Sequence, residues 1–249
     1  MISNTNAGLQ RLLDLLNETG KRYGMKVNVK KTKVLRVSKL TRKSNSIKIK
    51  IDGIEINQVK IFCYLGSIIS EDGRCENDIR CRLGMAKSKF IDNIQHLTGR
   101  TAIKTKKNII KTLIWSIALY ASECWTMRKS DIQRIEAFEM WCWRKMLKIK
   151  YTDHITNEEV LLTAGESRNM MTRIRKQQQK WIGHNLRHDE NLLTTVLEGK
   201  MKGKPARGRR CGFLDYLKQG KSYYEIKRCA KNRNEWKCWT PWTCQVAEH

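Results

Sequence analysis

The stretch SIKIKIDGIEI, residues 46–56, alternates isoleucine with polar residues on both sides of an Asp-Gly pair. A period of two places alternate side chains on the same face of a β-strand. Asp-Gly is favoured in two-residue hairpin turns, because both turn positions need positive φ angles. The stretch therefore predicts an antiparallel hairpin with Asp52 and Gly53 at its turn, and it carries the most specific local signal in the chain.

The residues around this hairpin extend it into a small β-rich unit. Leucines at helical spacing predict one amphipathic helix before it: Leu9, Leu12, Leu13 and Leu16. Asn6 is its predicted cap and Gly24 its predicted terminator. The period then changes to two, and strands are predicted at Val27–Val29, at 34–37 and at 59–65, where the last run ends at Gly66.

From Gly73 onward the apolar residues follow helical spacing. One stripe is Ile79, Leu83, Ala86, Phe90, Ile94 and Leu97; a second is Ile109, Ile110, Leu113, Ile114 and Ile117; a third is Ile132, Ile135, Phe138, Cys142 and Met146. Further helices are predicted at 160–164, 170–186 and 223–236. The run GKMKGKPARGRRCG, residues 199–212, has the composition of a linker.

The predicted fold is therefore α+β and mostly helical. We expect four segments: a helix with a small antiparallel β unit over residues 1–70, a multi-helix region over 71–198, a basic Gly/Arg linker over 199–212 and a tail over 213–249. Apolar residues make up 40% of the chain, which includes eight Trp, so a core can be buried. Four of the Trp lie on or beside the apolar stripes, namely Trp115, Trp125, Trp141 and Trp143, and most of these are predicted to pack in that core.

Charge gives the first indication of function. The chain has 50 Lys and Arg against 24 Asp and Glu, a net charge of +26. The basic residues recur along the whole chain instead of forming one tail, a distribution that suits a phosphate backbone. We therefore expect RNA, DNA or an RNA–DNA hybrid as the partner. The alternative is a generically basic protein with no such partner.

Cysteine usage and the absence of long apolar runs indicate an intracellular protein, in the nucleus or cytoplasm, that is not secreted. Nine Cys at irregular spacing include no CxxC pair, which favours reduced thiols. The first residues are polar and do not form a secretory signal. The longest apolar run, 113–122, is too short to span a bilayer, so no membrane partner is expected.

Five segments, in chain order, resemble the part of a non-LTR (LINE-type) retrotransposon reverse transcriptase that follows its catalytic aspartates. YGMKVNVKKTK (23–33) resembles the "GLKINxxKTK" segment at the end of the palm, and FCYLGS (62–67) resembles the "YLG" turn of the primer grip. ALYASECW (118–125) resembles the "LLYGSExW" signature after the thumb begins. WIGH (181–184) resembles the "WxGH" of the C-terminal extension, and 203–210 its "GRGRP" linker, although Arg209 and Arg210 replace the Pro step.

The resemblance implies a fragment of an RNA-directed DNA polymerase that keeps nucleic-acid binding. In that family nucleotidyl transfer uses two metal ions held by carboxylates that include an adjacent Asp pair. This chain contains no Asp-Asp, so no catalytic residue and no cofactor are expected in it, and Mg²⁺ is expected only for a complete enzyme. The alternatives are a non-catalytic RNA- or DNA-binding protein derived from a retrotransposon, or a decayed reading frame without a selected role.

The candidate nucleic-acid-binding residues are taken from these motifs and from the basic segments: Lys30, Lys31, Tyr64, Gly66, Arg173, Arg175, Lys176, Lys180, Trp181, Arg207, Arg209 and Arg210. Lys31 is also a possible general acid, as against an exposed lysine in a basic run. Tyr64 and Gly66 would let a primer backbone approach, or would simply end a strand. Trp181 would stack on a base, or pack in the core.

Two candidate metal sites have weaker signals. His184 and His188 lie four residues apart on one helical face, where surface histidines without a ligand role are the alternative. Cys229, Cys238, Cys244 and His249 would make a terminal zinc site only at an unusual spacing. No metal site is therefore predicted.

Overall fold

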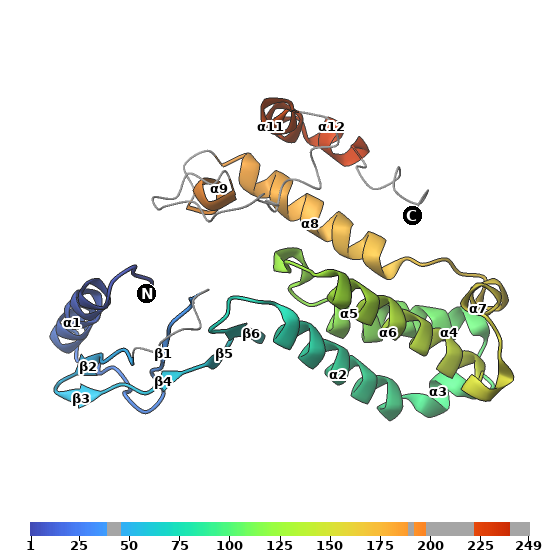
Figure 1. Ribbon diagram of the computed structural model, residues 1–249, viewed down its shortest axis with the longest axis horizontal. Helices are drawn as coiled ribbons and strands as arrows, with labels where there is room; N and C mark the ends of the chain where they lie inside the picture. Colours follow the sequence, from blue (N-terminus) through green and yellow to red (C-terminus); the bar gives the residue numbers. More distant parts are fainter. Residues whose placement is uncertain (39–45, 189–191, 198–221, 240–249) are drawn as a thin grey trace. The chain divides into compact units, whose positions relative to one another are not determined.

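The computed structural model describes residues 1–38, 46–188, 192–197 and 222–239. The described chain is mostly helical with a few short strands, which confirms the predicted α+β class. It divides into two compact units, Met1–Cys81 and Arg82–His249, and the division falls inside helix α2, Glu76–Asp92. Figure 1 labels the helices and strands of both units.

The first unit begins with helix α1, Asn6–Arg22. Its cap is Thr5, not Asn6 as predicted, because the Thr5 backbone is extended and its hydroxyl accepts from the Gly8 N–H at 3.0 Å. The helix gives way to a turn in which Gly24 adopts a φ of 69°, as a terminating glycine should.

The buried face of α1 differs from the predicted stripe. Leu13 is buried and Leu9 is half-buried, but Leu12 and Leu16 are exposed. The face that turns inward runs in steps of four and ends on Asn17, which is 9% exposed. An asparagine is buried there because its side chain has a partner, the Asp52 carboxylate at 2.9 Å.

The predicted hairpin is confirmed. Strands β2, Lys50–Ile51, and β3, Ile54–Glu55, pair antiparallel around Asp52 and Gly53, which have φ angles of 49° and 80°. Lys21 Nζ lies 2.6 Å from Asp52 Oδ1, and this hydrogen bond, followed by that from Asn17, keeps the pKa of the Asp52 carboxyl below its usual value. The turn is therefore held against α1 by two side chains of the helix.

The edge of β2 is covered by a side chain. Gln10 Nε2 donates to the Lys50 carbonyl at 2.8 Å, and Gln10 Oε1 accepts from the Lys50 N–H at 2.9 Å. The amide thus pairs with the backbone of β2 as a neighbouring strand would. Such cover protects an edge strand from pairing with another chain.

Four more strands form two further pairs. β1, Val34–Leu35, pairs parallel with β4, Gln58–Val59. β5, Ile61–Tyr64, pairs antiparallel with β6, Ser67–Ser70, around a turn in which Leu65 and Gly66 have φ angles of 49° and 83°. The run predicted as one strand over 59–65 is therefore divided between β4 and β5, and the second hairpin was not predicted.

The strand predicted at Val27–Val29 is wrong. The Asn28 carbonyl accepts from the N–H groups of Lys31 and Thr32, and the Thr32 hydroxyl also donates to it, so the chain turns there. Asn side chains favour such turns because they bond to nearby backbone. Val27 and Val29 still pack, half-buried, against the apolar cluster of this unit, which consists of Leu13, Val34, Ile49, Ile51 and Ile56.

The second unit is built from helices (Figure 1). After α2 these are α3 (Ile94–Thr98), α4 (Ile103–Ile109), α5 (Trp115–Ala118), α6 (Lys129–Leu147), α7 (Asn157–Ala164), α8 (Met170–Leu186), α9 (Leu192–Leu197), α11 (Tyr223–Lys231) and α12 (Arg233–Cys238). A π-helical turn, η1 (Ile110–Ile114), joins α4 to α5, and 3₁₀ turns lie at η2 (Ser122–Cys124) and η3 (Tyr151–Asp153).

The predicted apolar stripes form the core of this unit. The residues that are fully buried include Phe90 of α2, Ile114 and Ile135, whereas Ile94, Ile109 and Ile132 of the same stripes are half-buried. Core packing of the tryptophans is confirmed for Trp115, Trp125 and Trp143, which are at most 2% exposed. The one helix predicted over 223–236 is two, because Asn232 ends α11 and its side chain caps α12.

No helix within the described ranges is both long and apolar enough to cross a membrane.

Candidate nucleic-acid interface

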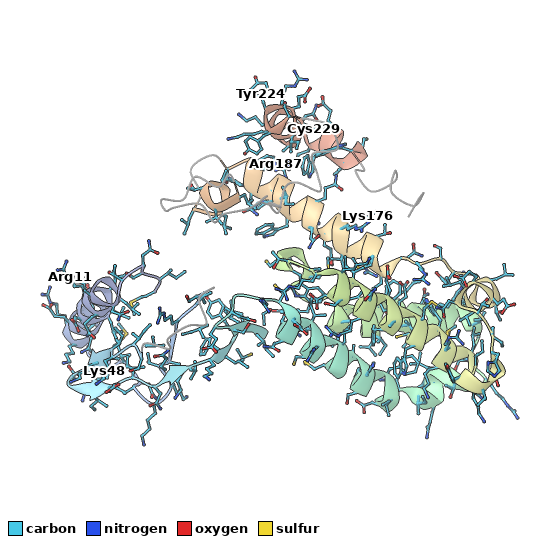
Figure 2. All side chains as sticks on the ribbon, in the orientation of Figure 1. Arg11, Lys48, Lys176, Arg187, Tyr224 and Cys229 are labelled. Carbon is cyan, nitrogen blue, oxygen red and sulfur yellow. The ribbon has the colours of Figure 1, made fainter. Side chains whose placement is uncertain are left out.

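Helix α8 presents a line of cationic side chains to solvent. Arg173, Lys176 and Lys180 are exposed and are spaced three and four residues apart, so they share one face of the helix. Figure 2 labels Lys176 on this helix. We call these three residues the α8 cationic stripe. The exposed His184 continues its line by one more turn.

The α8 cationic stripe is not neutralised within the described part of the chain. None of its three residues forms an ion pair there, whereas Lys107 and Lys111 both lie close to Glu166, at 3.2 and 2.7 Å. The Arg173 guanidinium is steadied by one bond, from Nη1 to the Lys111 carbonyl at 3.3 Å. The stripe therefore keeps its charge available for a polyanion.

Arg175, predicted with this group, is half-buried and lies off the stripe, two residues beyond Arg173 on a helix. Arg175 also takes part in an interaction of its own within the protein. Lys180, and not Arg175, therefore shares one face of α8 with Arg173 and Lys176.

Helix α8 also carries two buried glutamines that the sequence did not single out, and one of them, Gln178, lies on the face opposite the stripe. Gln178 Nε2 donates to the carbonyls of Ser122 and Trp125 at 3.3 and 2.9 Å. A signal for it existed, since Gln178 falls midway between Ile174 and Ile182 on a stripe with steps of four. A polar residue on a buried stripe indicates a hydrogen-bonding partner.

The bond from Gln178 holds the turn formed by the ALYASECW segment. Ala121 in this turn is left-handed, with a φ of 57°. The similar signature has glycine at this position, and glycine is the residue that adopts this conformation without steric cost. Ser122 is fully buried, and its hydroxyl donates to Gln177 Oε1 at 2.7 Å. This motif is therefore a backbone turn fixed to α8.

The WIGH segment has a packing role. A Cβ atom on Gly183 would overlap the Trp236 ring of α12. Trp236 Nε1 donates to the Gln179 carbonyl at 3.0 Å, and Gln179 Nε2 donates back to the Trp236 carbonyl at 2.9 Å. Gly183 thus makes room for the Trp236 ring. Trp236 lies 57 residues further along the chain than Gln179, with which it exchanges these hydrogen bonds.

Around Gly183 lies a second apolar cluster, which consists of Ile182, Leu186, Ile226, Ala230 and Trp236. Trp181 packs against it while remaining half-buried. Arg187, labelled in Figure 2, donates from Nη1 to the Ala230 carbonyl at 2.9 Å. Trp181 therefore makes a packing contact, which is the alternative to base stacking, and the residue is not fully buried.

The start of α8 is held by a carboxylate from α6. Glu139 is 1% exposed, and its Oε1 accepts from the backbone N–H groups of Asn169 and Met170 at 2.9 and 3.2 Å. Burial raises the pKa of Glu139, and the two hydrogen bonds oppose that rise. The carboxylate supplies partners to N–H groups that a helix start leaves unpaired.

The remaining candidate residues belong to the first unit or to undescribed segments. Lys30, Lys31 and Tyr64 are exposed, and Gly66 lies in the β5–β6 turn. Tyr64, at 57% exposure, is not a core residue. Arg207, Arg209 and Arg210 of the predicted linker lie outside the described residues.

The described residues complete neither of the two candidate metal sites. The rings of His184 and His188 lie 4.9 Å apart by centroid distance. Within the described ranges no group of three or more His, Cys, Asp or Glu side chains could hold a metal ion. Cys244 and His249 lie outside those ranges.

Comparison with known proteins links the chain to mobile elements. It is 23% identical over 204 residues to an uncharacterised transposon-derived protein of Caenorhabditis elegans, a match that covers 79% of this chain and 72% of that protein. No protein-family model matches the chain, and no solved structure is similar to it. The similarity supports an origin in a mobile element.

Proposed function

We propose that this chain is the nucleic-acid-binding part of an RNA-directed DNA polymerase from a LINE-type mobile element. The similarity to a transposon-derived protein supports the mobile-element origin. The order of the five motif-like segments favours the reverse-transcriptase family over other transposon proteins. The partners proposed are RNA, DNA or an RNA–DNA hybrid, bound mainly through phosphates.

The observation that carries this proposal is the α8 cationic stripe, in a chain of net charge +26. Three exposed cations in line on a rigid helix, without acidic partners in the described residues, suit the repeating charge of a phosphate backbone. The helix is fixed on its other face by Gln178 and at its start by Glu139. The stripe is therefore presented on a preorganised element, which lowers the entropic cost of binding.

Two observations favour a retained binding module over a decayed reading frame. Gly183 and Trp236 fit each other across two helices, and Gln178 meets two carbonyls of a distant turn. Unselected substitutions would be expected to disrupt such matched pairs, since most changes to buried contacts destabilise a protein. Sequence upstream of Met1 in the transcript distinguishes a module from a truncated enzyme: an in-frame aromatic-x-Asp-Asp would indicate the enzyme.

We further propose that this chain alone does not polymerise DNA, because two-metal catalysis needs a carboxylate pair that its sequence lacks. Lys31 would serve as a general acid only beside such a pair. The assay is extension of a primed RNA template by the pure protein with Mg²⁺ and nucleotides, and template-dependent extension would refute the proposal.

The experiment that tests binding is fluorescence anisotropy with labelled single-stranded RNA, duplex DNA and hybrid of equal length. We expect binding to all three with weak sequence preference. Affinity should fall by roughly 10³ to 10⁵ between about 50 and 200 mM salt if six to ten phosphates are contacted. Absence of binding at about 50 mM salt would contradict the proposed function.

A further inference from the structure

A surface pocket of about 410 Å³ lies in the second unit, where the end of α5, the turn η2 and helix α8 meet. Its volume is at the lower end of the range for pockets that hold small molecules. The residues that line it include Trp115, Leu119, Tyr120, Glu123, Arg173 and Gln177. Arg173 belongs both to this pocket and to the α8 cationic stripe.

The apolar part of the wall suits a planar ligand. Trp115 and Leu119 are nearly buried, whereas Tyr120 is 48% exposed. The Arg82 guanidinium lies 4.1 Å from the centroid of the Tyr120 ring, an arrangement that steadies the ring by a cation–π contact. A steadied, half-exposed aromatic ring is the kind of platform on which nucleobases stack.

The polar part of the wall combines opposite charges. The Glu123 carboxylate only accepts hydrogen bonds, and the Arg173 guanidinium only donates them. Glu123 would repel a phosphate group, so a phosphate is a poor ligand for the pocket itself. A flat heterocycle with neighbouring donors and acceptors fits both groups, and Gln177 adds an amide that can serve either way.

We propose that this pocket receives one unpaired guanine base of a bound strand. Of the four bases, guanine alone places two adjacent N–H donors, N1–H and the N2 amino group, beside an acceptor, O6, on its Watson–Crick edge. The two donors match the Glu123 carboxylate, and O6 matches a donor from Arg173 or Gln177. Unpaired bases are read in this way, by stacking on aromatic rings and bonds to their Watson–Crick edge.

The position of the pocket supports this ligand. Arg173 is the first residue of the α8 cationic stripe, so a strand whose phosphates follow Lys180, Lys176 and Arg173 would reach the pocket mouth. The inference rests on the proposed nucleic-acid binding, and it adds a base preference to an otherwise sequence-independent contact.

The test uses the whole chain and two single-stranded oligonucleotides of uridines, with either one central guanosine or one central inosine. Inosine keeps N1–H and O6 but lacks the N2 amino group. Because a hydrogen bond to a charged group is lost, we expect the inosine strand to bind about tenfold more weakly. The readout is the ratio of the two Kd values at one salt concentration.

Glu123→Gln should bring this ratio close to one, because an amide presents a donor where the carboxylate accepts. Glu158→Gln is the matched control, since it removes the same charge from an exposed position on α7 and should leave the ratio at about ten. Circular dichroism checks that both variants fold. Equal affinities for the two strands, or a preference that survives Glu123→Gln, would overturn the guanine site alone. Failure of both strands to bind would overturn the proposed function as well.

Discussion

The two compact units are stabilised in different ways. In Met1–Cys81 the strands are two to four residues long, and the apolar cluster has five buried residues while Leu12, Leu15 and Leu16 stay exposed on α1. In Arg82–His249 the helices bury a larger core, which includes Phe90, Trp115, Ile135 and Trp143, and matched polar contacts such as those of Gln178 join distant segments. The first unit therefore depends on its turns, and the second on its side-chain packing.

The largest effect expected from this contrast is at Gly183. Replacement by Ala would force the Trp236 ring away from α8 and break its bond to the Gln179 carbonyl. Overpacking of this kind costs up to about 3 kcal/mol. We expect a loss of that order in the free energy of unfolding, measured by urea titration.

Gly84→Ala is the matched control for Gly183→Ala. Gly84 also lies inside a helix, α2, but a Cβ atom there would meet nothing within 4 Å. Helix propensity alone should then stabilise the protein by about 0.5–1 kcal/mol. If both substitutions changed the free energy of unfolding in the same direction, Gly183 would not be a residue that packs against Trp236.

In the first unit a smaller loss is expected from Asn17→Ala. The substitution removes a partly buried hydrogen bond that ties α1 to the hairpin turn. A hydrogen bond to a charged group contributes about 1.5–3 kcal/mol, and the exposure of the Asp52 carboxylate places this one at or below about 1.5 kcal/mol. Native-state hydrogen exchange should show faster exchange of the hairpin amides, and unchanged exchange at Ile51 and Ile54 would disprove the tie.

The buried Glu139 carboxyl should make the stability of the protein depend on pH. Its folded-state pKa is raised above the ordinary value of 4.5, so the folded state binds this proton more tightly than the unfolded state does. The contribution of this group is thus most favourable below pH 4.5 and declines as the pH rises through the folded-state pKa. The unfolding free energy of the native protein, minus that of Glu139→Gln, should fall over this window by at most about 1.4 kcal/mol per pH unit. A difference that is flat or rises with pH would contradict the assignment.

The smallest effect is predicted at Ala121. Its left-handed backbone strains an alanine, and glycine relieves that strain at some cost in unfolded-state entropy. Ala121→Gly should therefore raise the unfolding free energy by about 0.5 kcal/mol. Thermal unfolding measures this, and a clear decrease in Tm would show that the turn does not need a left-handed residue.

Sequence patterns predicted the elements whose signals are local. The Asp52-Gly53 hairpin and helix 170–186 were placed correctly. An Asp-Gly pair and a helical spacing of apolar residues can both be recognised within a short stretch of sequence. The strand at Val27–Val29 was wrong, because alternation cannot show that Asn28 bonds to its own neighbours. Two-residue strands leave little pattern to detect.

The candidate site was predicted in part. Charge alone predicted Arg173, Lys176 and Lys180. Charge could not show that Arg175 lies off their face, because that depends on which side of the helix is exposed. The roles of Gly183 and Gln179 depend on Trp236, far along the chain, and no local rule connects them. The pocket beside Tyr120 depends on how η2 meets α8, and was not foreseen.

The most direct test of the central claim is charge reversal of the α8 cationic stripe. The triple variant Arg173→Glu, Lys176→Glu and Lys180→Glu should flatten the salt dependence of RNA binding by up to about three phosphate contacts, at about 0.9 per contact on duplex DNA and about 0.7 on single strands. Its control reverses three exposed lysines that are far apart in the sequence, Lys129, Lys145 and Lys237, for the same change in net charge. We predict a smaller slope and weaker binding for the stripe variant than for the control. Equal slopes in two folded variants would contradict the account, because binding would then follow net charge and not this helix.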